Sequence, residues 1–322
     1  MPSRARLATW GLVALLAIDV ALVSLAFRNP FRPAIATVPV STVTATARGT
    51  TSATSTDPAA TTASTTTADA SAPAPSGGVG APTVVPIDTT RAWRFTRGTC
   101  PGGGAKLSMT DNGGRTWTDV PIALGSISRV QATDATKVLI VGAETPTCRE
   151  TGLRTTDGGQ NWASMGSVSL WYIPAAAPSD VISSAGRTTK PCRPADTVSV
   201  SALSATAATV LCASGRVMET ADGGASWVEV VRGMQAVAVE AKVEANKLVA
   251  LVAYRADSCA GLQIASLAGG ATAKLGCVDL GGRGSDNLIG HVGLGVQGQG
   301  WWLVVDEATF RSEDGGKTWS TP

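Results

Sequence analysis

The 322-residue chain has 26 Lys and Arg against 24 Asp and Glu, a formal net charge of +2. This balance excludes the strongly basic surface with which proteins bind nucleic acid, so we expect no nucleic-acid partner. Charged residues make up only 16% of the chain, and Gly occurs 36 times. Low charge and many glycines favour an all-β protein with tight turns.

The first 33 residues predict an export signal with a membrane-spanning helix. Two arginines precede the apolar residues 8–27, a stretch of about 20 residues, which is the length of a bilayer-spanning helix. An uncleaved signal anchor would give a single-pass protein of the cell membrane with its folded part outside the cytoplasm. Ser24 and Ala26 before Phe27 also fit a cleaved signal peptide, which would leave a secreted protein.

Residues 34–82 predict a disordered linker. They are Thr, Ala, Ser and Pro with only Arg48, Asp57 and Asp69 charged, and this composition cannot bury a core. Such segments are typical of stalks that hold a folded head away from a membrane. We therefore expect the folded domain at residues 83–322.

An eight-residue pattern, the octet, recurs in this domain. It has Ser or Thr at its first position, Asp-Gly-Gly at the third to fifth and Trp at the eighth, as in residues 155–162, 220–227 and 312–319. Residues 110–117 have Asn112 in place of the Asp, and residues 266–273 keep the spacing but lose the Asp and the Trp. The starts at 110, 155, 220, 266 and 312 are 45, 65, 46 and 46 residues apart. This period indicates one repeated supersecondary unit, with a loop insertion in the longest interval.

The octet predicts a turn between two strands. Its carboxylate can accept hydrogen bonds from N–H groups of its own turn, and glycine adopts the positive φ that a hairpin needs. An apolar run upstream of four octets predicts a buried strand, at residues 138–141, 209–212, 248–253 and 301–305. Each unit then predicts a four-stranded meander of strands A, B and C, the octet turn, and strand D.

On these octets the chain resembles the Asp-box, or bacterial neuraminidase repeat (BNR), β-propeller family over about residues 83–322. The resemblance implies a propeller of about five four-stranded blades, with residues 83–87 as strand A of the first blade. It also implies that the octets are structural turns and that their Trp rings fill the space between blades, without a catalytic or metal-binding role. These structural residues are Asn112, Trp117, Asp157, Trp162, Asp222, Trp227, Asp314 and Trp319.

Six cysteines in the repeat region of an exported chain predict three disulfides. In the blade model, one pair spans strands C and D of the fourth blade, one bridges the strand B to C loops of the first two blades, and one links the insertion to the third blade. The expected pairs are Cys259 with Cys277, Cys100 with Cys148, and Cys192 with Cys212.

The rim opposite the octet turns is the predicted binding surface. The blade model places the strand B to C loops, all six cysteines and the insertion at residues 170–196 on this rim. Functional groups tend to lie on loops held by a rigid scaffold. The candidate binding residues are Arg97, Arg149, Trp171, Tyr172, Arg193, Tyr254, Arg255 and Arg283.

The resemblance also raises a sialidase-like exported glycoside hydrolase with a divergent active site. Sialidases use an arginine triad, a Tyr/Glu pair and an acidic residue, and carry an Arg-Ile-Pro motif. This chain has Trp-Tyr-Ile-Pro at residues 171–174, without the Arg, and only two tyrosines. At least three arginines around one pocket, with a carboxylate and Tyr254 within reach, would favour the enzyme.

We expect no catalytic residue, cofactor or metal site, since no His/Cys cluster suits zinc. The single histidine, His291, falls in an expected strand A, where a packed or pore-lining imidazole is favoured over a catalytic one. The sequence therefore favours a non-enzymatic, membrane-tethered propeller that binds a protein or a cell-envelope glycan. The resemblance implies such docking roles for photosystem II assembly factors and sortilin-type receptors.

Overall fold

The computed structural model describes residues 82–166, 168–244, 247–283 and 287–322. The predicted signal anchor at residues 1–33 and the predicted linker up to residue 81 lie outside these ranges. Within them, no helix has the length and apolar character needed to cross a membrane.

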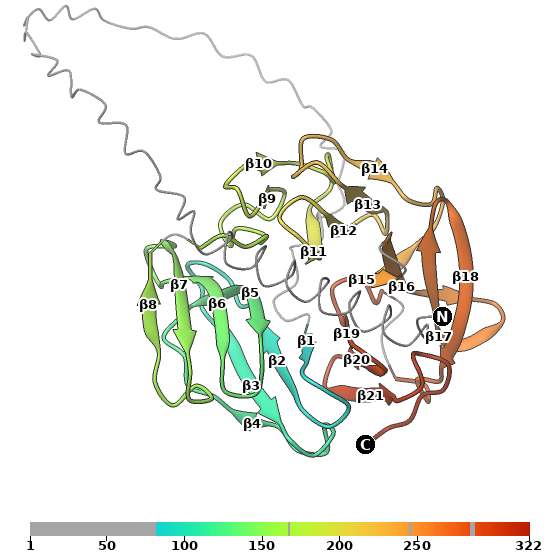
Figure 1. Ribbon diagram of the computed structural model, residues 1–322, viewed down its shortest axis with the longest axis horizontal. Coiled ribbons are helices and arrows are strands. Elements are labelled where there is room, and N and C mark those ends of the chain that lie inside the picture. The colour runs from blue at the N-terminus through green and yellow to red at the C-terminus, as the bar shows by residue number, and fades with distance from the viewer. Residues whose placement is uncertain (1–81, 167, 245–246, 284–286) are drawn as a thin grey trace, which may run out of the picture. The chain divides into compact units, whose positions relative to one another are not determined.

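Five antiparallel sheets form the blades of a β-propeller (Figure 1). Blade 1 contains β1 (Pro82–Pro86), β2 (Ala92–Thr96), β3 (Lys106–Thr110) and β4 (Thr118–Asp119). Blade 2 contains β5 (Ser126–Ala132), β6 (Val138–Ala143), β7 (Glu150–Thr155) and β8 (Ala163–Met165). Blade 3 contains β11 (Thr197–Ala202), β12 (Ala208–Cys212), β13 (Val217–Thr220) and β14 (Val228–Glu229). Blade 4 contains β15 (Ala236–Glu244), β16 (Lys247–Ala256), β17 (Cys259–Ala268) and β18 (Ala271–Val278), and blade 5 contains β19 (Val292–Gln297), β20 (Gly300–Val305) and β21 (Ala308–Ser312).

The predicted meander is confirmed in four blades. Their strands pair in chain order, and the four apolar runs of the sequence form the second strands β6, β12, β16 and β20. Blade 5 differs because it has three strands, followed by a single bridge between Arg311 and Ser320. Pro322, two residues further on, has no N–H group with which to extend that pairing.

The ring closes by packing between blades 5 and 1. Trp302 and Val304 of β20 form one apolar cluster with Val84 of β1 and Ala92 of β2. The Trp302 ring N–H also donates to the carbonyl of Asp88 at 2.9 Å. Strand β1 stays within its own sheet as the predicted strand A of blade 1, so closure depends on side chains and not on a strand shared between the terminal blades.

The octets fold into one recurring turn. In blade 2 the Thr155 hydroxyl donates to Asp157 at 2.7 Å and accepts from the Gly159 amide at 3.0 Å, while Asp157 accepts from the Asn161 amide at 3.0 Å. The same three bonds recur at the octets that begin at Thr110, Thr220 and Ser312. In the degenerate copy of blade 4, Gly269 and Gly270 alone form the turn between β17 and β18, both with positive φ.

The insertion at residues 170–196 does not lie where the sequence predicts it. It forms the two-stranded sheet of β9 (Val181–Ile182) and β10 (Thr188–Thr189), and it was expected to lie wholly on the rim opposite the octet turns. Instead Trp171 is only 2% exposed, packs edge-on against Trp227 of the third octet at 6.1 Å, and donates its ring N–H to the Ser204 carbonyl at 3.0 Å. The insertion packs as a wedge beside blade 3, because its apolar side chains are buried against that blade.

Candidate functional site

Two faces of the propeller are distinguished by a repeated hydrogen bond. In four blades the first glycine of the octet donates its N–H to a carbonyl of the turn between the first two strands, as Gly158 does to Thr136 at 3.0 Å and Gly223 to Thr206 at 2.9 Å. The octet turns and these first turns therefore share one face, called here the octet face. The loops between the second and third strands lie at the other strand ends and define the loop face.

The three disulfides brace the loop face. They join Cys100 with Cys148, Cys192 with Cys212, and Cys259 with Cys277, which are the pairs that the sequence analysis expected. The first crosses between the loops of blades 1 and 2. All six cysteines of the chain are thus paired, which is typical of a protein domain outside the cytoplasm.

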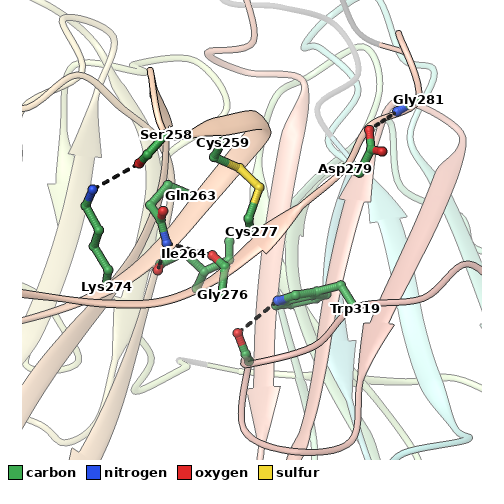
Figure 2. Close-up of a disulfide and its surroundings, with 11 residues drawn as sticks. Ser258, Cys259, Gln263, Ile264, Lys274, Gly276, Cys277, Asp279, Gly281 and Trp319 are labelled. Atoms are coloured by element: carbon green, nitrogen blue, oxygen red, sulfur yellow. Dashed lines mark hydrogen bonds between the residues drawn. A yellow bond between two sulfur atoms is a disulfide. The ribbon is translucent and has the colours of Figure 1, made fainter.

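The disulfide of blade 4 lies beside an irregularity of its sheet (Figure 2). The register between β17 and β18 shifts between Gln263 and Ala265. The buried Gln263 amide donates to the carbonyls of Ile264 at 2.9 Å and Gly276 at 2.8 Å. These bonds satisfy backbone acceptors that the bulge takes out of the ladder, so this end of the loop face is rigidly held.

Four predicted binding residues are exposed near the loop face: Arg149, Arg193, Arg255 and Arg283. The Arg149 guanidinium pairs with Glu144 at 3.0 Å and remains 74% exposed, and this pairing raises its pKa. Arg193 follows the disulfide-bonded Cys192, and Arg283 lies in the connection from blade 4 to blade 5. These cations come from blades 2 and 4, from the insertion and from that connection, so they are spread over the face.

The predicted aromatic residues of this rim are not its exposed groups. Trp171 is core, as described above, so its assignment to the binding rim is wrong. Tyr172 is half-buried and bridges to Ile182, and burial followed by the nearby Glu150 carboxylate raises its pKa. Tyr254 is also half-buried and packs against the apolar cluster between blades 3 and 4.

A central channel of about 480 Å³ runs along the innermost strands β1, β5, β11, β15 and β19. Its polar lining includes Arg129, whose guanidinium donates to the Val200 carbonyl at 2.7 Å and so links blades 2 and 3. Glu240 also lines the channel, where it accepts hydrogen bonds from the Ser201 hydroxyl and from the Ala241 amide. Burial raises the pKa of Glu240, while these bonds and the Arg129 charge oppose that rise.

Arg97, which was predicted on the rim, also lines this channel. It follows β2 at the loop-face end, and its side chain is half-buried. Desolvation lowers its pKa to about 10, and the carboxylate of Glu150 partly opposes that shift. The guanidinium remains charged at neutral pH, so a cation stands at the loop-face end of the channel.

Sequence reasoning missed the channel as a site. A signal was present in β5, where Arg129 interrupts a mostly buried strand. His291 is a second correction, since it is exposed just before β19 with its Nδ1 2.8 Å from Asp306, and it is neither packed in the core nor part of the channel lining. Among the described residues, no group of three or more His, Cys, Asp or Glu side chains could hold a metal ion.

Neither a family model nor a curated protein matches the chain. Among solved structures, YCF48 bound to D1 peptide is 18% identical over 75% of this chain and 81% of that one, with a TM-score of 0.26. The GH74 xyloglucanase from Xanthomonas campestris is 19% identical, with a TM-score of 0.30; the match covers 76% of this chain but only 38% of the xyloglucanase. An AofleA mutant from Arthrobotrys oligospora is 8% identical over 72% of this chain and 82% of that one, with a TM-score of 0.41. At these values the similarity assigns no function.

Proposed function

We propose that this protein is an exported, membrane-tethered and non-enzymatic propeller whose loop face docks a protein or a cell-envelope glycan. The observation that carries the proposal is the bracing of that face by three disulfides, which hold exposed, charged loops on a rigid ring. A preorganised surface loses little conformational entropy when a partner binds. The octet face lacks such cross-links among the described residues.

The channel argues against the hydrolase alternative. Two arginines line it, Arg97 and Arg129, where an arginine triad was the criterion for an enzyme. Tyr254 is not part of its lining, and Arg129 is engaged with a backbone carbonyl. The lining of this channel thus differs from the Arg, Tyr and carboxylate constellation by which we would recognise the enzyme.

The test is a binding assay with the full-length chain, oxidised and solubilised in detergent, against fractionated envelope glycans and envelope proteins. The loop-face variant carries Arg149→Glu and Arg193→Glu. The matched control carries Arg115→Glu and Lys317→Glu, which make the same charge change at exposed positions of the octet face. We expect the loop-face variant to lose at least tenfold in affinity for the captured ligand and the control to bind like the wild type.

Two results would reject the proposal. Equal binding by the loop-face variant and the wild type would exclude this face as the docking surface. Turnover in a sialoside or general glycosidase assay that disappears when channel residues are changed would instead support the hydrolase.

A further inference from the structure

The loop-face end of the channel contains donors without partners. Arg97 forms no ion pair within 4.0 Å and no side-chain hydrogen bond with any other described residue, and its one resolved electrostatic partner is Glu150. A guanidinium has five N–H donors and no acceptor. The Arg97 side chain is half-buried, so its guanidinium is partly desolvated and its donors stay available to a ligand.

Two hydroxyls that line the same cavity are also unsatisfied. Ser128 is 3% exposed, and its Oγ has no hydrogen-bond partner among the described residues. Ser199 lines the cavity too, and its buried Oγ likewise lacks a partner in the described part of the chain. Both belong to the first strands of their blades near sites where the register shifts, after Ile127 in β5 and between Thr197 and Ser199 in β11. Bulges of this kind redirect side chains next to binding sites.

Backbone pairing brings Arg97 and Ser128 to one place. The Ile127 amide donates to the Arg97 carbonyl at 2.7 Å, and Gly98 bridges to Ser126. Ser128 directly follows Ile127 in β5, and the side chains of Arg97 and Ser128 both line the channel. Arg97 and Ser128 therefore both lie where blades 1 and 2 meet the channel.

The second channel arginine, Arg129, has the hydrogen-bond acceptor and the counter-ion that Arg97 lacks. Arg129 donates to the Val200 carbonyl at 2.7 Å, and the carboxylate of Glu240 supports its charge. For Arg97 the corresponding carboxylate, Glu150, accepts from the Ala175 amide at 3.1 Å instead. Burial raises the pKa of Glu150, which weakens it as a counter-ion. Of the two channel arginines, Arg97 is the one whose guanidinium has no hydrogen-bond acceptor among the described residues.

We propose that the loop-face end of the channel binds a small oxyanion, a carboxylate or phosphate group, through the Arg97 guanidinium and the Ser128 hydroxyl. The chemistry follows from the donors, since arginine can only donate and a serine hydroxyl can donate to a charged oxygen. Planar oxyanions match the fork of a guanidinium. The cavity of about 480 Å³ admits a group of this size. The site does not depend on which macromolecule the loop face docks.

The experiment is calorimetric titration of the oxidised full-length chain in detergent with inorganic phosphate and, separately, with acetate at constant ionic strength. Glucose serves as the neutral probe. We expect saturable binding of one anion per chain and none of glucose. Stronger binding of phosphate would assign the site to phosphoryl groups, and stronger binding of acetate would assign it to carboxylates.

The variants locate the site. Arg97→Gln should weaken anion binding at least tenfold and Ser128→Ala a few-fold, while Arg115→Gln, which removes an exposed cation of the octet face, should bind like the wild type. Absence of saturable binding of both anions to the wild type, or unchanged affinity in Arg97→Gln, would overturn the proposal. If Arg97→Gln fails to fold by circular dichroism, unchanged affinity in Ser128→Ala overturns it equally.

Discussion

Two blade junctions of this ring are built differently. Between blades 4 and 5, side chains of the two sheets interlock directly, with Trp301, Leu303 and Phe310 of blade 5 in one cluster with Leu262 and Ile264 of blade 4. Between blades 2 and 3, the insertion provides the apolar cover for blade 3. Its cluster combines Trp171, Ile173 and Val181 of the insertion with blade 3 residues and contains no side chain of blade 2. An octet Trp therefore needs a neighbouring apolar surface, but that surface need not come from the preceding blade.

The substitution Trp171→Ala tests the difference between the two junctions and should have the largest effect. Removing a buried Trp leaves a cavity, so we expect the free energy of unfolding to fall by about 3–5 kcal/mol in urea denaturation. Trp301→Ala at the direct junction is the matched control and should cost a similar amount. Only Trp171→Ala should open the insertion to limited proteolysis within residues 172–190. A loss below about 1 kcal/mol would mean that the wedge does not support blade 3.

One disulfide lies at each of these two junctions, so removing them one at a time tests the same difference. The pairs Cys192–Cys212 and Cys259–Cys277 close loops of similar length, with sequence separations of 20 and 18, so removing either should cost about 3 kcal/mol through chain entropy. Both cysteines of the first pair are fully buried, whereas Cys277 is exposed. Replacing the first pair by Ala should therefore cost about 1 kcal/mol more, because it also leaves a cavity in the wedge core. Equal denaturation midpoints for the two double variants would contradict this.

Arg129 provides the polar link between blades 2 and 3. The substitution Arg129→Met tests how much this link stabilises the fold. Losing its charged hydrogen bond to Val200 should cost about 2 kcal/mol at pH 8. Because burial raises the pKa of Glu240, lowering the pH neutralises this carboxylate and removes its need for a cation. The cost of Arg129→Met should therefore shrink as the pH falls toward 5. Glu240→Gln in the same chain should abolish this pH dependence, and a cost independent of pH would rule out the pairing.

The smallest effect concerns the octet turns, which are alike at both kinds of junction. Hydrogen bonds from Asn161 and Thr155 lower the pKa of Asp157 to about 2, and equivalent bonds lower those of Asp222 and Asp314. A carboxylate with a depressed folded-state pKa stabilises the fold above its unfolded pKa of about 3.9, and this stabilisation is lost as the pH falls through the folded value. We expect the melting temperature to fall between pH 4 and pH 2.

Asn substitution at these three octets should flatten that decline, since Asn112 makes the same turn naturally and accepts from the Thr116 amide at 3.1 Å. The single variant Asp222→Asn, beside the wedge, should behave like Asp314→Asn at the direct junction. Melting curves between pH 7 and pH 2 provide the check. A different acid response of the two single variants would show that the wedge alters the neighbouring turn.

Local chemistry determined much of this architecture from the sequence alone. The octets prescribe their own hydrogen bonds within eight residues, so their positions predicted the corners and the number of the blades. Apolar runs such as residues 301–305 predicted buried strands for the same reason, because burial on both faces needs no knowledge of the neighbour. The disulfide pairs followed from the blade order, since the hairpin of blade 4 brings Cys259 near Cys277 and neighbouring blades bring their loops together.

Contacts between segments distant in sequence were decided only by the tertiary structure. Trp171 was expected on an open rim and lies in a core, because the surface that covers it is the third octet, 56 residues away by position. Arg97 was expected on the same rim and lines the channel, because β2 ends where blades 1 and 2 meet. His291 lies in solvent because the register places it one residue before β19. Burial and charge balance depend on the whole ring, which no local pattern encodes.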